Sequence, residues 1–244
     1  MTHPDWIVPD WPAPPNVRAL ITTRAGGASR GAYASFNLGL RCGDEEAAVS
    51  ENRARLHGTL PQAPKWLAQV HGATVVEADG LDHVPAADAS VARAPGTVCA
   101  VMIADCLPVL LCDAAGTTVS VAHAGWRGLA AGVIENTVAA MGVAPDELVA
   151  YLGPGIGPRA FEVGADVRDA FVVRDDAAAG AFAPVHAGKW LADLFSLARR
   201  ALARAGVDRV HGGGLCTYTD AARFFSYRRD GTTGRMAALI WRDR

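Results

Sequence analysis

The sequence predicts an α/β fold in which mixed β-sheets are flanked by helices. Segments with strand-type and helix-type patterns alternate along the chain. Several strands in the middle are joined by tight turns, whereas parallel pairs require long crossovers, so a purely parallel sheet is disfavoured. Half of the residues are hydrophobic, which is ample for a sizeable core. No linker divides the 244 residues, and we therefore expect a single layered domain over residues 1–244.

Local patterns place the elements in the first half of the chain. Residues 17–23 combine apolar and β-branched side chains, as strands do. Asp44 is a suitable N-cap for a helix that runs to about His57. A hairpin is expected from residues 66–71 and 74–78, around a glycine turn.

The middle and second half continue the alternation. Residues 98–104 form a continuous apolar run, which is typical of a buried strand. Two more strands, at 108–112 and 117–123, are joined by a turn. One helix is expected from about 126 or 128 to 141. The remaining expected elements are a strand at 148–152, helices at 165–171 and 191–205, a loop at 175–183 and a closing strand at 236–241.

Composition and charge disfavour several classes of function. The formal net charge is −2 and the arginines are scattered, so nucleic-acid binding is not expected. No apolar run reaches the ~18 residues of a membrane span, and the N-terminus lacks the pattern of a signal peptide. The five cysteines are an odd number, which favours reduced thiols and a cytoplasmic protein. The sequence does not define an oligomeric state.

Three side chains suited to a metal ion stand at the ends of predicted strands: His71, Cys106 and His123. Two imidazoles and one thiolate can hold zinc and leave a fourth position open, as in catalytic zinc sites. The spacings, 35 residues from 71 to 106 and 17 from 106 to 123, match no local zinc-finger pattern. Taken alone, a residue such as His71 is more often a structural histidine, and one such as Cys106 is more often an inert buried thiol, whereas His123 fits either role. All three stand at junctions of strand and loop, which favours a functional role.

Each of the other candidate residues has a functional and a structural interpretation. Asp105 can orient a ligand imidazole or move a proton, or it is an ordinary turn residue. Arg127, at the start of a predicted helix, can favour a phosphate or is a solvated charge. Arg228 lies in the aromatic–arginine segment 224–230, which can stack a base and hold an anion or form a corner of the core. The glycine loop 153–157 lacks the Gly-Lys-Ser/Thr end of a Walker motif.

Several short motifs follow one another from about residue 6 to the C-terminus. Together they closely resemble the YfiH-type family, also called the laccase-domain or polyphenol oxidase family. The motifs are Phe36-Asn37-Leu38-Gly39, Cys42-Gly43-Asp44, Gln69-Val70-His71-Gly72, Ala104-Asp105-Cys106-Leu107-Pro108-Val109-Leu110, His123-Ala124-Gly125-Trp126-Arg127-Gly128, Leu152-Gly153-Pro154-Gly155-Ile156-Gly157 and Phe225-Ser226-Tyr227-Arg228-Arg229-Asp230 with Thr233-Gly234-Arg235.

The resemblance implies a single α-β-β-α domain with zinc, or else copper, held by His71, Cys106 and His123. It implies phosphorolysis of adenosine, inosine, guanosine and methylthioadenosine into base and pentose 1-phosphate, accompanied by adenosine deamination. Purine nucleosides and phosphate are therefore the expected partners. The family's older label is copper-dependent phenol oxidation.

The resemblance also assigns expected roles. Arg53, in Glu51-Asn52-Arg53, matches the family's catalytic arginine best. The expected catalytic residues are Arg53, Asp105 and Cys106, and the expected substrate- or phosphate-binding residues are Asn37, Arg53, Arg127 and Arg228. The family often has a hydroxyl residue before the Ala-Asp-Cys motif, where this chain has Ile103, and a change in specificity or rate is expected if that position touches substrate.

Three alternatives stay open at this point. A copper oxidase normally uses several coppers and many histidines, whereas this chain has seven. A cysteine hydrolase would use Cys106 as nucleophile, His123 as base and Asp105 nearby. A zinc-stabilised interaction module would need the metal for folding alone.

Overall fold

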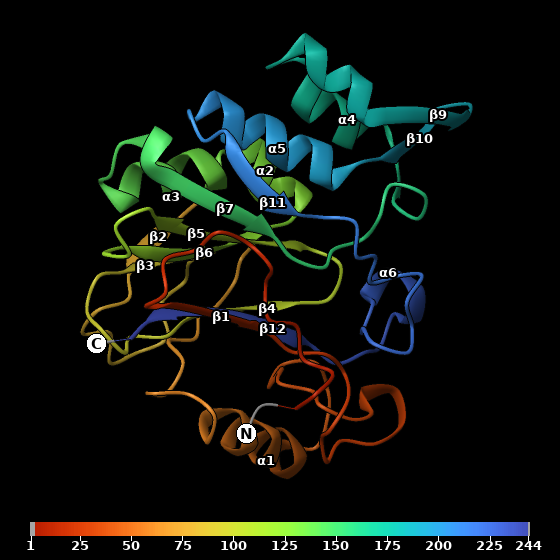
Figure 1. The fold of residues 1–244 in the computed structure, drawn as a ribbon. Helices are drawn as coiled ribbons and strands as arrows, with labels where there is room; N and C mark the ends of the chain where they lie inside the picture. Colours follow the sequence, from red (N-terminus) through yellow and green to blue (C-terminus); the bar gives the residue numbers. More distant parts are fainter. Residues whose placement is uncertain (1–2, 244) are drawn as a thin grey trace.

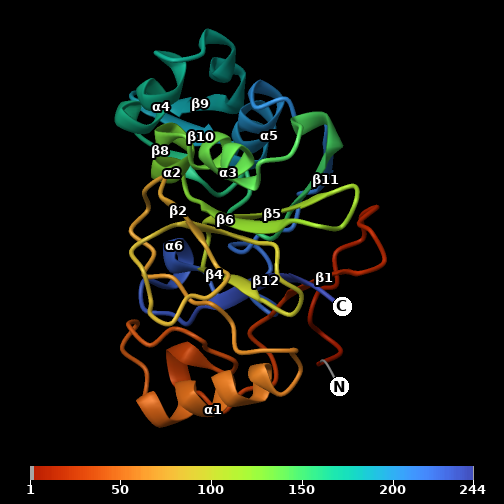
Figure 2. The same cartoon turned by 90° about the vertical axis from the view of Figure 1, so that its left-hand side faces the viewer.

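The chain forms four layers in a computed structural model that describes residues 3–243 (Figures 1 and 2). One outer layer is α1 (Glu46–His57), and the next is a sheet of β1 (Val17–Ile21), β12 (Met236–Arg242) and β4 (Cys99–Ile103). The third layer is a six-stranded sheet, and helices cover its far face. The predicted α/β class with mixed sheets flanked by helices is confirmed. Met1, Thr2 and Arg244 of the predicted domain 1–244 lie outside the described residues, and its boundaries stay a prediction.

The six-stranded sheet has the order β11-β7-β5-β6-β3-β2. Its centre is antiparallel, whereas β11 lies parallel to β7 and β2 parallel to β3, so the expectation of a mixed sheet was correct. Its strands are β2 (Val75–Glu77), β3 (Ala89–Ala92), β5 (Leu107–Asp113), β6 (Val119–Ala124), β7 (Leu148–Leu152) and β11 (Arg209–Gly212).

The covering helices are α2 (Trp126–Ala131), α3 (Val133–Met141) and α5 (Leu194–Arg204). A small outer sheet, in the order β8-β10-β9, lies beside α4 (Ala165–Val172). Its strands are β8 (Glu162–Val163), β9 (Phe182–His186) and β10 (Lys189–Ala192), and the short helices are α6 (Tyr227–Asp230) and the 3₁₀ turns Gly31–Tyr33, Pro145–Glu147 and Asp176–Ala181.

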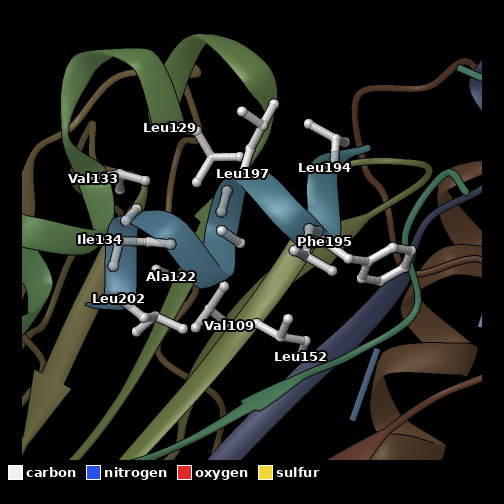
Figure 3. Packing of buried hydrophobic residues seen from close by; sticks show 14 of the residues in the cluster. Val109, Ala122, Leu129, Val133, Ile134, Leu152, Leu194, Phe195, Leu197 and Leu202 are labelled. Carbon is white, nitrogen blue, oxygen red and sulfur yellow. The ribbon is translucent and has the colours of Figure 1, made fainter. Parts of the chain in front are cut away.

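Strand periodicity divides the core into three apolar layers. In β5, Val109 and Leu111 face the covering helices, whereas Leu110 and Cys112 face the other sheet. Strand β12 likewise alternates between the space between the sheets and the layer under α1. Figure 3 shows side chains of α5 meeting those of α2, α3 and the sheet. Strands buried on both faces must be apolar throughout, which explains the continuous apolar runs in the sequence.

Two predicted elements of the first half were wrong. No hairpin forms at 66–71, because Asp88 accepts hydrogen bonds from the backbone of residues 70–72 and bends that segment into a loop. Asp44 does not cap α1, whose N-cap position is Glu45. The Asp44 carboxylate instead accepts a hydrogen bond from Asn37 Nδ2 at 2.9 Å.

Helix boundaries in the second half also differ from the sequence prediction. The helix expected up to residue 141 is broken at Gly132, whose φ of 91° is left-handed, so α2 and α3 are separate. The helix expected from Leu191 begins at Leu194, because the Asp193 carboxylate caps the backbone N–H groups of Phe195 and Ser196. No helix among the described residues is long and apolar enough to cross a membrane.

The ion pairs of Asp175 predict a pH-dependent stability. Asp175 pairs with Arg200 at 2.6 Å and Arg204 at 3.2 Å, and these hydrogen bonds and charges lower its pKa below the ordinary value. The pairs therefore stabilise the fold at neutral pH, and this stabilisation is lost as the pH falls from about 4, the unfolded value, through the lowered folded pKa.

We expect Asp175→Asn to lower the denaturation midpoint at neutral pH, with a difference from wild type that disappears in acid. Asn keeps the N-cap contact to Ala177 through its amide oxygen, whereas it removes the charge and one acceptor of the arginine hydrogen bonds. Urea denaturation followed by circular dichroism across pH measures the difference. Asp208→Asn, at an exposed position that forms none of the ion pairs among residues 3–243, is the matched control. A difference that persists in acid would contradict the ion-pair origin.

Candidate metal and anion site

His71, Cys106 and His123 converge, although they come from three separate segments. One ligand atom of each lies within 4.8 Å of the others. The two imidazole rings meet edge to face, with centroids 4.9 Å apart and an interplanar angle of 71°. Two ring nitrogens and one sulfur at this separation can share a single ion. The donor set fits zinc, and His₂Cys is also a known copper set, so geometry does not choose between the two metals.

The register of the β5–β6 hairpin places Cys106 near His123. Leu107 pairs with Ala124 and Pro108 with His123, so Cys106 comes opposite Gly125. A side chain on Gly125 would put its Cβ 2.7 Å from the Cys106 sulfur and 3.5 Å from His71 Cδ2. Only glycine leaves room for the sulfur at this point of the hairpin.

Cys106 lies where the chain passes from one sheet to the other. Strand β4 belongs to the three-stranded sheet and β5 to the six-stranded sheet, with only residues 104–106 between them. The sharp change of direction puts Asp105 at φ 92°, in the left-handed region that non-glycine residues avoid. Two hydrogen bonds hold the Asp105 carboxylate there, from Thr217 Oγ1 at 2.6 Å and from the Arg228 backbone N–H at 2.7 Å. This strained residue therefore fixes the position of the neighbouring thiol.

The fully buried carboxylate of Asp88 connects the two histidines. It accepts hydrogen bonds from the N–H groups of Val70, His71 and Gly72, which fix the loop that carries the first imidazole. Its Oδ1 also lies 2.9 Å from His123 Nδ1. With Nδ1 engaged by the carboxylate, Nε2 of His123 is directed to a metal. Sequence reasoning missed Asp88, because an isolated Asp in a loop carries no motif.

Charge coupling favours a thiolate at this site. Burial raises the pKa of the Cys106 thiol, but the charges and hydrogen bonds of His123 and His71 outweigh burial and bring it to about 6. Burial lowers the pKa of His123, yet the thiolate of Cys106 and the carboxylate of Asp88 raise it to about 9. The result is a thiolate–imidazolium pair, in which an incoming cation takes the place of the imidazolium proton.

The three ligands open into a cavity of about 730 Å³, within the range that holds a small-molecule ligand. Arg53, Arg127 and Arg228 line it, as does Asp105, so the structure brings these predicted residues together with the three ligands. Two further lining residues, Arg41 and Arg235, were missed, because scattered arginines give no pattern in one sequence.

Two positions singled out in the sequence lie away from the cavity lining. Asn37 is fully buried and holds its own loop, accepting from the N–H groups of Gly39 and Arg235 and donating to Asp44. These hydrogen bonds shape the 37–44 loop, and the expected contact of Asn37 with substrate stays a prediction. Ile103 is buried between the two sheets, so the hydroxyl that the family often carries there would not face the cavity.

Similar proteins identify the family. The family described as "Multi-copper polyphenol oxidoreductase laccase" matches residues 18–243. The chain belongs to this family. It is 56% identical to the purine nucleoside phosphorylase YfiH of Escherichia coli over 238 residues, 96% of this chain and 98% of that protein. A purine nucleoside phosphorylase of Pseudomonas aeruginosa is also 56% identical, over 97% of this chain and 98% of its own length.

Solved structures agree with the fold. The crystal structure of a Neisseria meningitidis protein superposes with a TM-score of 0.96 at 55% identity, covering 98% of this chain and all of that one. The family and the names of the relatives support an enzyme, and the site supplies one converging His/Cys/His group in the described part of the chain.

We expect Asp88→Asn to weaken metal binding by about 10–100-fold, the usual effect of removing a ligand's hydrogen-bond partner. Each Asp88 oxygen accepts two hydrogen bonds, so the amide NH₂ of Asn would face a donor in either orientation. A chelator competition titration measures the affinity. Asp79→Asn is the matched control, because Asp79 accepts from the backbone of Arg93 and Ala94 in another loop. Equal losses in both variants would contradict the positioning role.

We expect Gly125→Ala to fold but to bind metal poorly, because the added methyl group occupies the space of the Cys106 sulfur. Gly125 has φ −68° and ψ 166°, which alanine adopts without strain, so any effect comes from the sulfur contact. Metal content by elemental analysis and the far-UV spectrum separate the two effects. Gly180→Ala, where nothing lies within 4 Å of the added carbon, should retain full metal content. Full metal content in Gly125→Ala would disprove this contact.

Proposed function

We propose that the chain is a metal-dependent purine nucleoside phosphorylase. The substrates are a purine nucleoside and phosphate, and the products are the free base and pentose 1-phosphate. The observation that carries the proposal is a His/Cys/His group inside a cavity lined by arginines. The names of the E. coli and P. aeruginosa relatives support the same reaction.

Arg53 and Arg228 are suited to hold the phosphate. Arg53 stacks over Trp66 at 4.5 Å, donates through Nε to the Leu38 carbonyl at 2.9 Å and keeps its charge although burial lowers its pKa. Arg228 stacks over Phe161 and is fixed through its backbone to Asp105, next to the metal ligand. Guanidinium groups with fixed orientation bind a phosphate dianion in one geometry, which positions its oxygen for attack on C1′ of the ribose.

Arg127 and Asp105 have supporting roles in the proposed reaction. Arg127 stacks over Trp126 at 4.5 Å and lines the cavity, so it adds positive charge where the anions enter. Asp105 was also expected to move protons. Both its oxygens accept hydrogen bonds from Thr217 and Arg228, and we therefore assign it the positioning of Cys106.

We propose zinc as the ion that His71, Cys106 and His123 hold. When bound, zinc supplies Lewis acidity and an activated water near neutral pH. That chemistry also suits adenosine deamination, the second activity we propose, since replacing the amino group at C6 of the purine requires water. The cytoplasmic location expected from the cysteines stays a prediction.

The three alternative functions predict different experimental results. A copper oxidase would oxidise phenols when loaded with copper, and His₂Cys is a donor set that copper accepts. A cysteine hydrolase would be alkylated and inactivated at Cys106 even when saturated with metal, whereas a coordinated thiolate is shielded. An interaction module would unfold when its metal is removed.

We expect Cys106→Ala to lose its metal, because one of the three ligands is removed. Its rate of inosine phosphorolysis should fall at least about 100-fold, since loss of a residue that only supports a ligand already costs up to about 100-fold. Chromatography of inosine plus phosphate measures hypoxanthine, and elemental analysis measures zinc and copper. Cys216→Ala, which removes a half-buried thiol outside the cavity lining, should retain both metal and activity. Unchanged hypoxanthine release by metal-free Cys106→Ala would refute the proposal.

A further inference from the structure

The cavity holds more positive charge than one phosphate needs. Five arginines line it, at positions 41, 53, 127, 228 and 235, against a single carboxylate, that of Asp105. The protein as a whole has a formal net charge of −2, so this concentration of positive charge is local. Neither Arg41 nor Arg235 takes part in the ion pairs found among residues 3–243. Unpaired charges in a cleft attract anionic ligands.

Arg235 stands beside Arg53 on one wall. The backbone of Leu38 lies between them, since its N–H donates to the Arg235 carbonyl at 3.0 Å and its carbonyl accepts from Arg53 Nε at 2.9 Å. The Arg235 stem lies against Gly39, where an added Cβ would be 2.8 Å from Cγ. Arg41 follows two residues later in the same 37–44 loop and also lines the cavity. All three arginines line the cavity, and Arg53 and Arg235 are bonded to the loop that carries Arg41, so we treat them as one wall.

The Arg235 guanidinium is fixed in place before any ligand arrives. Its Nη1 donates to the carbonyls of Thr233 and Gly234 at 2.8 and 2.9 Å, and its planar group lies 5.8 Å from the Tyr227 ring centroid. Its Nε and Nη2 donors have no acceptor among the described residues. Tyr227 is 60% exposed and also lines the cavity, so it offers an aromatic face beside the free donors. A flat base and an anion can be held side by side at such a place.

We propose that Arg41 and Arg235 form a second anion subsite for a phosphate ester carried by the substrate itself. The cavity then takes a purine nucleoside 5′-phosphate in preference to the uncharged nucleoside. This inference rests on the proposed function, because Arg53 and Arg228 are assigned to inorganic phosphate there. The two remaining guanidinium groups on the Arg53 wall are left to bind the ester.

The test is binding of inosine 5′-monophosphate and of inosine to the metal-loaded protein by isothermal titration calorimetry. We expect the monophosphate to bind at least about 10-fold more tightly, a typical gain from charge-assisted hydrogen bonds. Added salt should reduce this preference, because exposed charges are screened. In Arg41→Ala and in Arg235→Ala the ratio of the two affinities should fall about 10-fold.

Two controls isolate the subsite. Arg159→Ala removes an exposed arginine outside the cavity lining and should leave the ratio unchanged. Arg235→Lys keeps the charge without the planar fork and should retain part of the preference, which separates loss of the anion contact from a change in the loop. Ribose 5-phosphate and inorganic phosphate, titrated alone, show whether the base contributes to binding.

The outcomes also separate this inference from the proposed function. Equal affinity of wild type for both ligands, or an unchanged ratio in Arg41→Ala and Arg235→Ala, would overturn the second subsite. Phosphorolysis of inosine together with equal affinities leaves the proposed function intact and removes only this inference. Tighter binding of the monophosphate without any phosphorolysis of inosine would contradict the proposed function and support the second subsite.

Discussion

The carboxylate of Asp88 is the contact on which the rest of the site depends. One buried side chain accepts three backbone N–H groups from the loop of His71 and holds the ring of His123. A buried carboxylate is costly unless its oxygens are satisfied, and here the donors that satisfy it are parts of the site. The hydrogen bonds that satisfy the carboxylate therefore also hold the two imidazoles in place.

The second constraint is the passage of the chain between the two sheets. A connection of three residues leads from β4 to β5, and it leaves Asp105 with a left-handed backbone and Cys106 facing the histidines. The carboxylate of Asp105 ties this connection to α6, which carries Arg228. The cavity lining includes residues at the ends of strands from both sheets and residues of α6. Figure 1 shows α6 beside the two sheets. Groups held on strand ends keep a fixed geometry, which catalysis and metal binding both require.

Electrostatics links the metal group to the arginines. The Cys106 thiolate and five arginines line the same cavity, so negative and positive charges face one shared space. Aromatic rings under Arg53, Arg127 and Arg228 orient these cations. Such an arrangement holds anions without reorganisation, and it is consistent with phosphate as a co-substrate.

The sequence by itself determined the layers and part of the site. Apolar runs and tight turns are local signals, so the β5–β6 hairpin was predictable, and with it the neighbourhood of Cys106 and His123. The break at Gly132 and the start of α5 were not predicted. A left-handed glycine and a capping aspartate set these helix boundaries, and hydrophobic periodicity does not locate helix ends. Only the tertiary structure decided that His71 joins the group, and that Asp88 holds it, since this loop is fixed by contacts distant in sequence. The same holds for Arg41 and Arg235, whose shared wall arises from the pairing of the 37–44 loop with the start of β12.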